Sequence, residues 1–341
     1  MQSARVALVN PAHWHFDFYK PGIDASRGQI VGFTEDNQGR RAALANSLAA
    51  PCLPDIEALV TSTHPDFVFA FGEHAKLSSI SSKLVELGVP FSIEKPGALT
   101  ASEVGHVARL AENAGVFVSV PFHYRMSDFW RSVEDLDVRK RGEIRSLRIE
   151  VSARSPEQHA DGSPWLSRLD GAGGGAAINL GHHPIDFALA FLGHEIAEID
   201  AWTSNSGLGL EVEDEAEFQI AFSSGAVAKI RTSYNHPGSA GTYMGFGFAL
   251  EHERFSVELR DENLFVTPRS GLPTMACPAR FIFKKHFADY ANNTLIRALT
   301  GGPPIAGLRD LENTMKIIDA VYAAASNGSP QKVASFSRVA P

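Results

Sequence analysis

Short apolar runs alternate with helical patterns in the first part of the chain, and this alternation limits the fold more than any other feature. The apolar runs occupy residues 5–9, 29–34, 66–71, 90–93 and 116–120, and the helical patterns occupy residues 40–48, 75–87 and 101–113. Apolar strands that alternate with helices predict a parallel sheet covered on both faces. In such a sheet, ligands bind at the carboxyl ends of the strands. We therefore predict an α/β, Rossmann-like domain that ends near residue 122.

The residue pattern changes after Pro121. Residues 144–153 alternate apolar and polar side chains, which is typical of a strand with one face in water. Further strands are predicted at residues 196–203, 215–222, 226–234, 243–251 and 254–259, with a turn at residues 223–225, and helices at residues 129–136, 287–299 and 308–325. We expect these strands to be successive and antiparallel, so the fold class is an α/β Rossmann-like domain plus an α+β domain with a large, mainly antiparallel sheet.

The length of the chain also favours two domains. A chain of 341 residues is long for one domain and can bury two separate cores. We predict a nucleotide-binding domain over residues 1–122 and a domain for substrate binding and oligomerisation over residues 123–341. The final helix, at about residues 308–325, can pack back on the first domain.

Charge and composition exclude several classes of protein. The net charge is -8, from 31 Lys and Arg against 39 Asp and Glu, and no basic run is present, which argues against nucleic acid as a partner. No apolar stretch is long enough to cross a membrane, and the first residues lack the apolar core of a signal peptide. Cys52 and Cys277 lack metal-binding spacing, which predicts free thiols in a reducing compartment. We therefore expect a cytoplasmic protein without a nucleic-acid or membrane partner.

A polar cluster interrupts an apolar stretch at residues 173–193. If this stretch is helical, Asn179 and His183 lie one turn apart on one face, and Asp186 follows on much the same face. Pro184 is expected to kink or restart the helix. A polar row inside an apolar helix needs partners or a ligand. Two interpretations stay open at this point, namely a buried helix with satisfied histidines and a functional site.

The turn after the first strand departs from the glycine-rich loop that cradles a pyrophosphate in most dinucleotide-binding domains. Its sequence is Asn10-Pro11-Ala12-His13-Trp14-His15, which contains no glycine. Asn10 tolerates an unusual backbone angle, and Ala12 is small enough for moderately close approach of a ligand. Both a functional and a lost dinucleotide site therefore stay open for this loop.

Acidic residues follow the second predicted strand, where a carboxylate holds a ribose hydroxyl in dinucleotide-binding domains. Glu35 lies twenty residues past His15, and Asp36 comes next. These acids favour NAD over NADP, because a carboxylate repels the 2′-phosphate of NADP. Arg40 and Arg41 weaken this preference, and the acids can also be ordinary loop residues.

Glu94-Lys95-Pro96 follows the fourth predicted strand, and by itself this motif fits a surface ion pair. Together with other segments, it resembles the E-K-P motif of the Gfo/Idh/MocA oxidoreductases, the group of glucose–fructose oxidoreductase and inositol dehydrogenase. Residues 179–186 resemble that family's D-x-G-x-H-x-x-D segment, residues 173–175 its glycine lead-in, and residues 122–125 its aromatic–polar–Arg sequence. The resemblance spans nearly the whole chain, with the motifs in the family's order.

The resemblance implies a nicotinamide cofactor, NAD or NADP, on the first domain and a sugar, polyol or related hydroxy compound between the domains. The implied reaction is hydride transfer between the carbinol carbon of this small-molecule substrate and the nicotinamide. Lys95 corresponds to the family's catalytic lysine and His183 to its acid/base histidine. A histidine can accept the hydroxyl proton near neutral pH, and a lysine charge can stabilise the alkoxide that forms.

Asn179 stands where the family pattern has an aspartate. An asparagine can orient the His183 ring through its amide oxygen but supplies no charge, so we expect His183 to be a weaker base. This departure and the glycine-free loop motivate an alternative function, a catalytically weakened or inactive family member that senses a ligand or nucleotide. A further alternative is a metal-dependent hydrolase that uses His13 and His15, although the second half does not supply the eight βα units of a zinc-dependent barrel.

The candidate site residues are the motif residues and their expected neighbours at the domain crevice. The catalytic candidates are Lys95, His183 and Asn179, the cofactor candidates are Asn10, Ala12, His13, Trp14, Glu35, Asp36, Gly72, His74, Glu94 and Lys95, and the substrate candidates are His123, Arg125, Arg154, Trp165, His182 and Asp186. Arginine suits an anionic group and Trp165 can stack on a sugar, whereas a structural role is the alternative for each. We expect Asp186 to support the site, with Lys95 as its partner, and we predict no metal site.

The predicted antiparallel sheet also bears on oligomeric state. If helices cover only one of its faces, the other face is left open, and such a face is usually buried against another subunit. We therefore predict a homodimer or a homotetramer.

Overall fold

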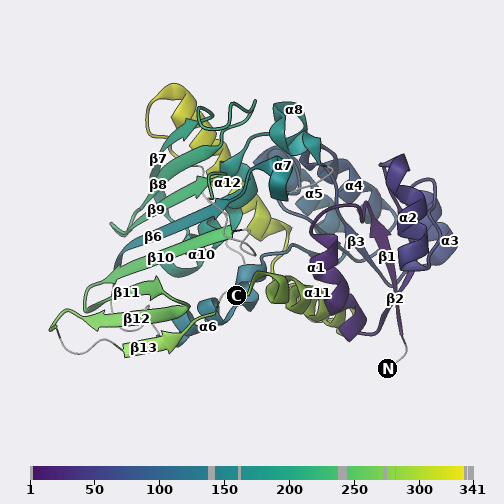
Figure 1. Cartoon of the computed structure of the whole chain (residues 1–341), viewed down its shortest axis with the longest axis horizontal. Helices are drawn as coiled ribbons and strands as arrows, with labels where there is room; N and C mark the ends of the chain where they lie inside the picture. The colour runs from purple at the N-terminus through teal and green to yellow at the C-terminus, as the bar shows by residue number, and fades with distance from the viewer. Residues whose placement is uncertain are drawn as a thin grey trace.

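The computed structural model describes residues 3–136, 143–159, 163–236, 244–271, 275–280, 282–333 and 336. Their strands form a smaller sheet A in the first part of the chain and a larger sheet B in the remainder (Figure 1). The expected combination of a Rossmann-like domain with an α+β domain is confirmed. The boundary between the two domains at residue 122 stays a prediction.

Sheet A is parallel throughout and has the strand order β2-β1-β3-β4-β5. Its strands are β1 (Ala4–Val9), β2 (Gly28–Thr34), β3 (Phe67–Ala70), β4 (Phe91–Ile93) and β5 (Val118–Ser119). The side chains of β3 and β4 are buried on both sides, as expected for apolar strands between helical layers. The strand order reverses next to β1, so the carboxyl ends of β1 and β3 border the crevice where α/β sheets bind ligands.

The helices of the first domain include two that the sequence pattern does not predict. They are α1 (Phe16–Ala25), α2 (Gln38–Leu48), α3 (Ile56–Thr63), α4 (His74–Glu86) and α5 (Ala101–Ala114). The unpredicted α1 contains Pro21, which normally breaks a helix. This helix persists because its buried face packs against α11 (Phe283–Thr300) near the end of the chain. The other unpredicted helix, α3, is too short to show a clear period.

Sheet B has the strand order β13-β12-β11-β10-β6-β9-β8-β7. Its strands are β6 (Ile144–Ala153), β7 (Ile196–Ser204), β8 (Glu215–Phe222), β9 (Val227–Ser233), β10 (Met244–His252), β11 (Phe255–Arg260), β12 (Asn263–Pro268) and β13 (Met275–Pro278). All neighbours are antiparallel except β6 and β9, which are parallel. The expectation of successive antiparallel strands is therefore wrong at this pair, because β7, β8 and β9 form a meander whose last strand returns beside β6.

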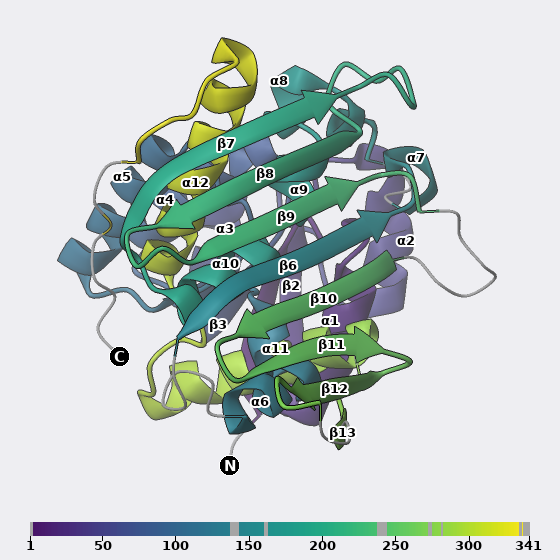
Figure 2. The ribbon, with the colours of Figure 1, turned by 90° about the vertical axis from the view of Figure 1, so that its left-hand side faces the viewer.

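One face of sheet B carries no helix, as Figure 2 shows. Its exposed side chains include Glu217, Lys229 and Arg231, which are polar. Trp202 on β7 is also 54% exposed on this face. The predicted homodimer or homotetramer stays a prediction. Within the part of the chain that the structure describes, no helix has the length and apolar character needed to cross a membrane.

The central stretch of the second domain forms two helices, α9 (Ala176–Leu180) and α10 (His182–Leu192), with Gly181 between them. The expected kink therefore lies one turn before Pro184 rather than at it. Proline has no N–H to donate to the carbonyl oxygen of residue 180, so the helical hydrogen bonds are interrupted there. Asn179 and His183 consequently lie on opposite sides of the break.

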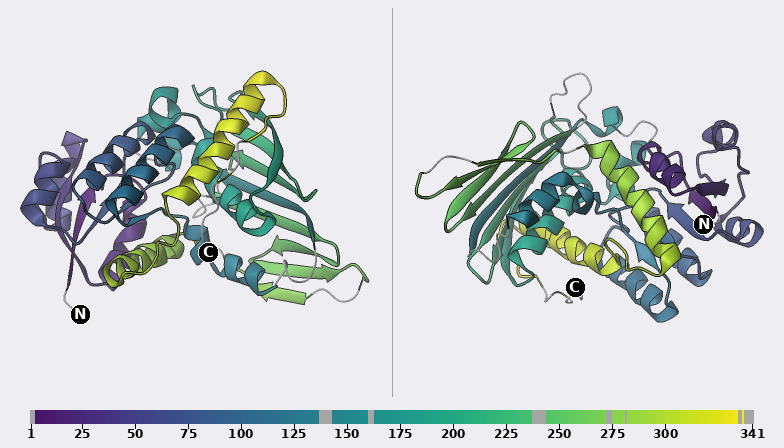
Figure 3. Two further views of the ribbon diagram at one scale, coloured as in Figure 1. Left: turned by 180° about the vertical axis from the view of Figure 1, so that it is seen from behind. Right: turned by 90° about the horizontal axis from the view of Figure 1, so that it is seen from below.

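Several shorter helices and the last two long helices complete the second domain. They are the 3-10 helices η1 (His123–Met126) and η2 (Pro164–Ser167), and the α-helices α6 (Asp128–Asp135), α7 (Pro156–His159), α8 (Leu169–Ala172), α11 and α12 (Leu308–Asn327). The helix α11 packs against α1, and α12 packs against α5 and β7 (Figure 3). Tyr290 of α11 also hydrogen-bonds to Ser92 and Ser119 of sheet A, at 2.8 and 2.9 Å. These helices fix the two domains against each other.

Candidate active site

Lys95 joins the two domains at the carboxyl end of β4. A cis peptide bond connects Lys95 to Pro96. The side chain of Lys95 is buried, and its Nζ donates to the carbonyl oxygen of Asn179 at 2.6 Å and to its Oδ1 at 2.8 Å. Burial lowers the pKa of Lys95 to about 8, although Glu94 opposes this effect. The E-K-P motif of the first domain thus meets the central helices of the second.

Glu94 supports the loop before α1. Its Oε1 accepts a hydrogen bond from the Tyr19 hydroxyl at 2.6 Å and lies 3.1 Å from Nδ1 of His15. Burial alone would raise the pKa of Glu94, but His15 and Lys95 lower it to about 2. The carboxylate of Glu94 is buried and already has these partners, and its cofactor role stays a prediction.

His183 lies in an aromatic environment close to Lys95. Its ring stacks on Tyr124 with centroids 4.3 Å apart, and it meets the edge of the His123 ring at 4.3 Å. Its Nδ1 is buried and has no hydrogen-bond partner among the described residues. Burial and the nearby Lys95 charge lower the pKa of His183 well below its usual value. The ring is therefore neutral at neutral pH.

Asn179 does not orient the His183 ring. Its Oδ1 accepts from Lys95, and its Nδ2 donates to the Tyr234 hydroxyl at 3.0 Å. The expected amide contact with the histidine is therefore wrong, because Lys95 occupies both oxygens of Asn179. In an unbroken helix, the carbonyl oxygen of Asn179 would instead accept from the backbone N–H of His183.

Arg125 and Asp186 form a buried structural ion pair. Nε and Nη2 of Arg125 donate to the two carboxylate oxygens of Asp186 at 2.9 and 2.5 Å, and Nη2 also contacts Asp310 at 2.8 Å. The expected pairing of Asp186 with Lys95 is wrong, because the bidentate arginine satisfies the carboxylate. Both residues line a separate crevice of about 840 Å³.

Two other histidine candidates have structural partners. His74 Nδ1 lies 2.9 Å from the carbonyl oxygen of Ala172, and this contact links α4 to α8 across the domains. His182 Nδ1 lies 2.8 Å from the Thr314 hydroxyl on α12. Each ring is buried between helices and has a partner at Nδ1, whereas Nε2 of His182 has none among the described residues. The roles of His74 and His182 stay predictions.

His123 keeps its place among the substrate candidates. Its ring is 1% exposed, and neither ring nitrogen has a hydrogen-bond partner among the described residues. It lies 4.0 Å from the ring of Phe287 and 5.2 Å from that of Phe283, both on α11. Burial and His183 lower the pKa of His123 well below its usual value. An unpaired buried imidazole beside His183 can bind a polar group of a ligand.

Two connected crevices lie at the carboxyl ends of β1, β2 and β3. Their volumes are about 300 and 380 Å³, which is within the range of ligand sites. The first is lined by Asn10, Ala12, His13, Glu35, Asp36, Asn37, Gly72, Glu73, Lys76, Ser163, Pro164 and Trp165. Asn10, Glu35, Asp36 and Lys76 also line the second. Five cofactor candidates beyond Glu35 are thus brought together here, namely Asn10, Ala12, His13, Asp36 and Gly72.

Two substrate candidates are placed differently from the expectation. Trp165 lines the first crevice, next to the loop after β1, and so lies beside the cofactor candidates. Arg154 directly follows β6 and is half-buried, and it is absent from the described residues that line the two crevices. The substrate role of both residues stays a prediction.

The loop after β1 is held by its own hydrogen bonds. Asn10 has φ 53°, so the expected left-handed backbone is present without a glycine. The Ala12 N–H donates to Glu35 Oε2 at 2.9 Å, and the Asn37 N–H donates to Glu35 Oε1 at 2.8 Å. Both oxygens of Glu35 thus accept a backbone N–H, and the cofactor role of Glu35 stays a prediction. Both Glu35, which is buried, and Asp36, which is exposed, line the crevices.

Aromatic rings close the inner end of the first crevice. The rings of His13 and Trp14 stack with centroids 3.8 Å apart, and Trp14 lies 5.9 Å from Trp165 of the second domain. Trp14 therefore packs against the other domain and is not a lining residue of the crevice. This contact fixes the width of the entrance between the domains.

The histidines of this loop do not form the metal pair of the hydrolase alternative. Nδ1 of His13 accepts from the His15 N–H at 3.2 Å, and Nδ1 of His15 contacts Glu94. No group of three potential metal ligands is present among the described residues. The parallel sheet A and the mainly antiparallel sheet B also exclude a βα barrel. The hydrolase alternative is therefore wrong on fold and on geometry.

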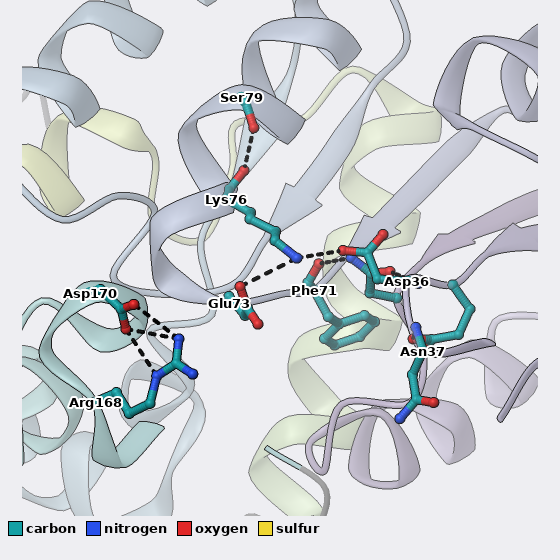
Figure 4. Close-up of polar contacts among 10 residues, drawn as sticks. Asp36, Asn37, Phe71, Glu73, Lys76, Ser79, Arg168 and Asp170 are labelled. Carbon is teal, nitrogen blue, oxygen red and sulfur yellow. Dashed lines mark hydrogen bonds and ion pairs between the residues drawn. The ribbon is translucent and has the colours of Figure 1, made fainter. Parts of the chain in front are cut away.

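Lys76 is a crevice residue that the sequence analysis does not identify. It lies in the first turn of α4, and its Nζ is 3.1 Å from Asp36 Oδ2 and 3.3 Å from Glu73 Oε2 (Figure 4). A basic residue in the first turn of the helix that follows the third strand is a signal that could have indicated Lys76. Asn37, Ser163 and Pro164 are also missed, because turns and irregular segments give no periodic pattern.

Two family models match this chain. The model of the oxidoreductase family with an NAD-binding Rossmann fold (GFO_IDH_MocA) matches residues 9–122. The model of the GFO/IDH/MocA C-terminal domain matches residues 136–257. Together the matched ranges cover more than half of the chain and include strands of both sheets.

Several solved structures share the fold over the whole length. An oxidoreductase from Agrobacterium radiobacter in complex with NAD+, L-tartaric acid and magnesium has a TM-score of 0.82 at 19% identity, over 97% of this chain and 98% of that chain. GenD2 from gentamicin A biosynthesis in complex with NAD has 0.84 at 17% identity, over 98% and 97%. Levoglucosan dehydrogenase in complex with NADH has 0.82 at 18% identity, over 98% and 100%. At these identities the likeness concerns the fold.

Proposed function

Because this chain belongs to the GFO/IDH/MocA oxidoreductase family, with its NAD-binding Rossmann fold, we propose that it transfers a hydride between a nicotinamide cofactor and a carbinol carbon. The substrate is a sugar, polyol or related hydroxy compound. One observation carries the proposal: Lys95 of the first domain is bonded to Asn179, beside His183 of the second.

The charges at this point suit the oxidation of an alcohol. Nicotinamide, when bound, supplies the hydride acceptor. The hydroxyl must lose its proton as its carbon loses the hydride, and neutral His183 can accept that proton. The ammonium group of Lys95 stabilises the developing alkoxide and so lowers the pKa of the hydroxyl. Because the pKa of His183 is depressed, the reaction depends on Lys95 to make the hydroxyl acidic enough.

The cofactor fits the crevices at the ends of β1, β2 and β3. The cofactor would lie against the protein backbone at Asn10, Ala12 and Gly72, and the Asp36 carboxylate would accept hydrogen bonds from its ribose hydroxyls. We infer that NAD is preferred over NADP, since the carboxylate of Asp36 repels a 2′-phosphate. The pair of Lys76 with Asp36 reduces this preference without removing it.

The substrate side is built from uncharged groups. His123 and His183 are neutral imidazoles whose planes lie at 70° to each other, and the rings of Phe283 and Phe287 border His123. Neutral donors and acceptors between aromatic rings suit the hydroxyls and C–H faces of a sugar or polyol. Levoglucosan, the compound after which one structural relative is named, belongs to the same chemical class.

Binding and turnover of the purified protein test the proposal in two steps. Calorimetric titration with NAD(H) and NADP(H) comes first, and we expect binding at micromolar strength. A panel of sugars and polyols is then assayed by the absorbance of reduced nicotinamide. Lys95→Met and His183→Ala should each lower kcat/KM at least about a hundredfold. Retained NADH binding in both variants shows that the fold is intact.

The same experiment separates the alternative function. A protein that binds NAD(H) and a polyol without turnover is the ligand or nucleotide sensor. One observation favours this alternative, namely that Nδ1 of His183 has no partner among the described residues to raise its basicity. Full activity in either variant removes that residue from the mechanism, and no binding of any nicotinamide dinucleotide refutes the oxidoreductase proposal.

A further inference from the structure

The contacts of the cofactor crevice bear on how an anionic ligand is held. We propose that Lys76 binds the diphosphate group of a dinucleotide, in place of the loop amides that cradle it in glycine-rich Rossmann loops. The inference rests on the proposed function, because it concerns the same crevice. It concerns a residue for which the sequence motifs of the chain give no role.

Three amides of the loop after β1 already have partners. The Ala12 N–H donates to Glu35, the His13 N–H donates to the carbonyl oxygen of Asn10, and the His15 N–H donates to His13. The first turn of α1 also contains Asp17, an exposed carboxylate that opposes an anion at the helix N-terminus. These three N–H groups therefore donate to the protein itself, whereas in a glycine-rich loop such groups hold a pyrophosphate.

Lys76 lies where its ammonium group can bind a diphosphate in place of these loop amides. Among the described residues that line the crevices, it is the only lysine or arginine common to both. A dinucleotide bound across the crevices would bring its diphosphate within reach of this side chain. Figure 4 shows the side chain of Lys76 directed between Glu73 and Asp36.

The present partners of Lys76 can be exchanged at little cost. Its side chain is 47% exposed, and that of Asp36 is 61% exposed. Exposed ion pairs of this kind contribute little to stability. A diphosphate brings more negative charge and more acceptor oxygens than a single carboxylate. On binding, Lys76 turns to the diphosphate and leaves Asp36 for the ribose hydroxyls.

The other cations that line the crevices have partners elsewhere; Arg40 lines neither crevice, and its Nη1 donates to the carbonyl oxygen of Ala12 at 3.2 Å. Arg41 lines the second crevice only, and its Nε donates to the carbonyl oxygen of Glu35 at 2.7 Å. Lys83 also lines the second crevice only, and its ammonium group pairs with Glu57 at 3.0 Å and with Glu86 at 3.3 Å. Neither side chain lines the first crevice, whereas Lys76 lines both.

Binding measurements on variants of the full chain test this role. NADH, ADP-ribose and adenosine are titrated into the wild type, Lys76→Met, Lys76→Arg and Lys20→Met. Lys20 is the matched control, because it is 41% exposed, pairs with Asp24 at 2.8 Å and lies outside the crevices. We expect Lys76→Met to weaken NADH and ADP-ribose about tenfold, to leave adenosine unchanged and to reduce the salt dependence of NADH binding. Lys76→Arg should retain most of the affinity, and Lys20→Met all of it.

The outcomes distinguish this inference from the proposed function. Equal NADH affinity in Lys76→Met and the wild type overturns the role of Lys76 and leaves the oxidoreductase proposal intact. An equal loss for adenosine and for ADP-ribose also overturns it, because the effect then does not come from the phosphates. Absence of NADH binding to the wild type overturns both. Melting temperatures of the variants within about 2 °C of the wild type show that the measured losses are not losses of fold.

Discussion

Replacement of Asn179 by aspartate offers the sharpest test of how Lys95 works. The Oδ1 atom of Asn179 lies 2.8 Å from the Lys95 Nζ, and both side chains are buried. Asn179→Asp keeps the shape of the side chain and changes a neutral oxygen to an anionic one. The variant also restores the residue that the family pattern has at this position.

The size of the effect on Lys95 follows from the geometry. Opposite unit charges 2.8 Å apart attract by about 6 kcal/mol at an effective dielectric constant of about 20. The cost of burying a new carboxylate offsets part of this attraction. If about half remains, roughly 3 kcal/mol, the pKa of Lys95 rises by about 2 units. It would move from about 8 to about 10.

The assay is the pH dependence of kcat/KM for alcohol oxidation. Because the reaction needs Lys95 charged, the wild type should lose activity above about pH 8. The aspartate variant should keep its activity to about pH 10. Tyr234→Phe serves as the control, since it removes a partner of Asn179 without adding charge, and its activity should still fall above about pH 8.

A specific result would refute this reasoning. If folded Asn179→Asp loses activity at the same pH as the wild type, then Lys95 is not the group that limits the reaction at high pH. A loss at the same pH in Tyr234→Phe is expected and does not bear on Lys95. If Tyr234→Phe shifts the limit as far as the aspartate does, the effect comes from packing rather than charge.

Two predictions concern stability. The pKa of Lys95 is about 8 in the folded protein, against a reference value of 10.5. The unfolded state therefore binds more protons between pH 8 and pH 10.5, and the free energy of unfolding should rise there by roughly 3 kcal/mol. Urea unfolding of the wild type and of Lys95→Met checks this, because the variant should lack that rise. In Gly22→Ala the added Cβ would lie 1.9 Å from the carbonyl oxygen of Ala288 on α11, so we expect a loss of more than about 2 kcal/mol by thermal unfolding. The control Gly39→Ala, on the exposed face of α2, should gain about 0.5 kcal/mol, and equal melting temperatures for the two alanine variants would contradict the packing of α1 on α11.

The elements that the sequence predicts correctly are those whose information is local. Strand β6 and strand β8 have the predicted bounds, because each alternates buried and exposed side chains along its whole length. Helix α1 escapes prediction because its stability comes from α11, which lies far away in the sequence. The parallel pairing of β6 with β9 is likewise invisible in any local pattern, since it depends on the path of the intervening chain.

The site shows the same division between local and distant information. The sequence alone could assign the E-K-P motif and the central helices to one site, because the spacing of the two segments resembles a family pattern. The partner of Asp186 could not be derived, because Arg125 lies 61 positions away and Asp310 lies on another helix. Nor could the sequence decide which of the adjacent acids Glu35 and Asp36 turns inward. That choice depends on two backbone N–H groups, those of Ala12 and Asn37.

The glycine-free loop indicates that different residues of this chain serve stability and cofactor binding. A glycine-rich loop leaves its amides unpaired until a phosphate arrives, whereas here Glu35 holds the loop before any ligand is present. Asn10 supplies the left-handed backbone at φ 53°, and His15 bonds to Glu94 beneath α1. The loop therefore stabilises the fold, and the affinity for an anion must come from side chains that the fold does not need. Lys76 is such a side chain, which is why its replacement should separate cofactor binding from stability.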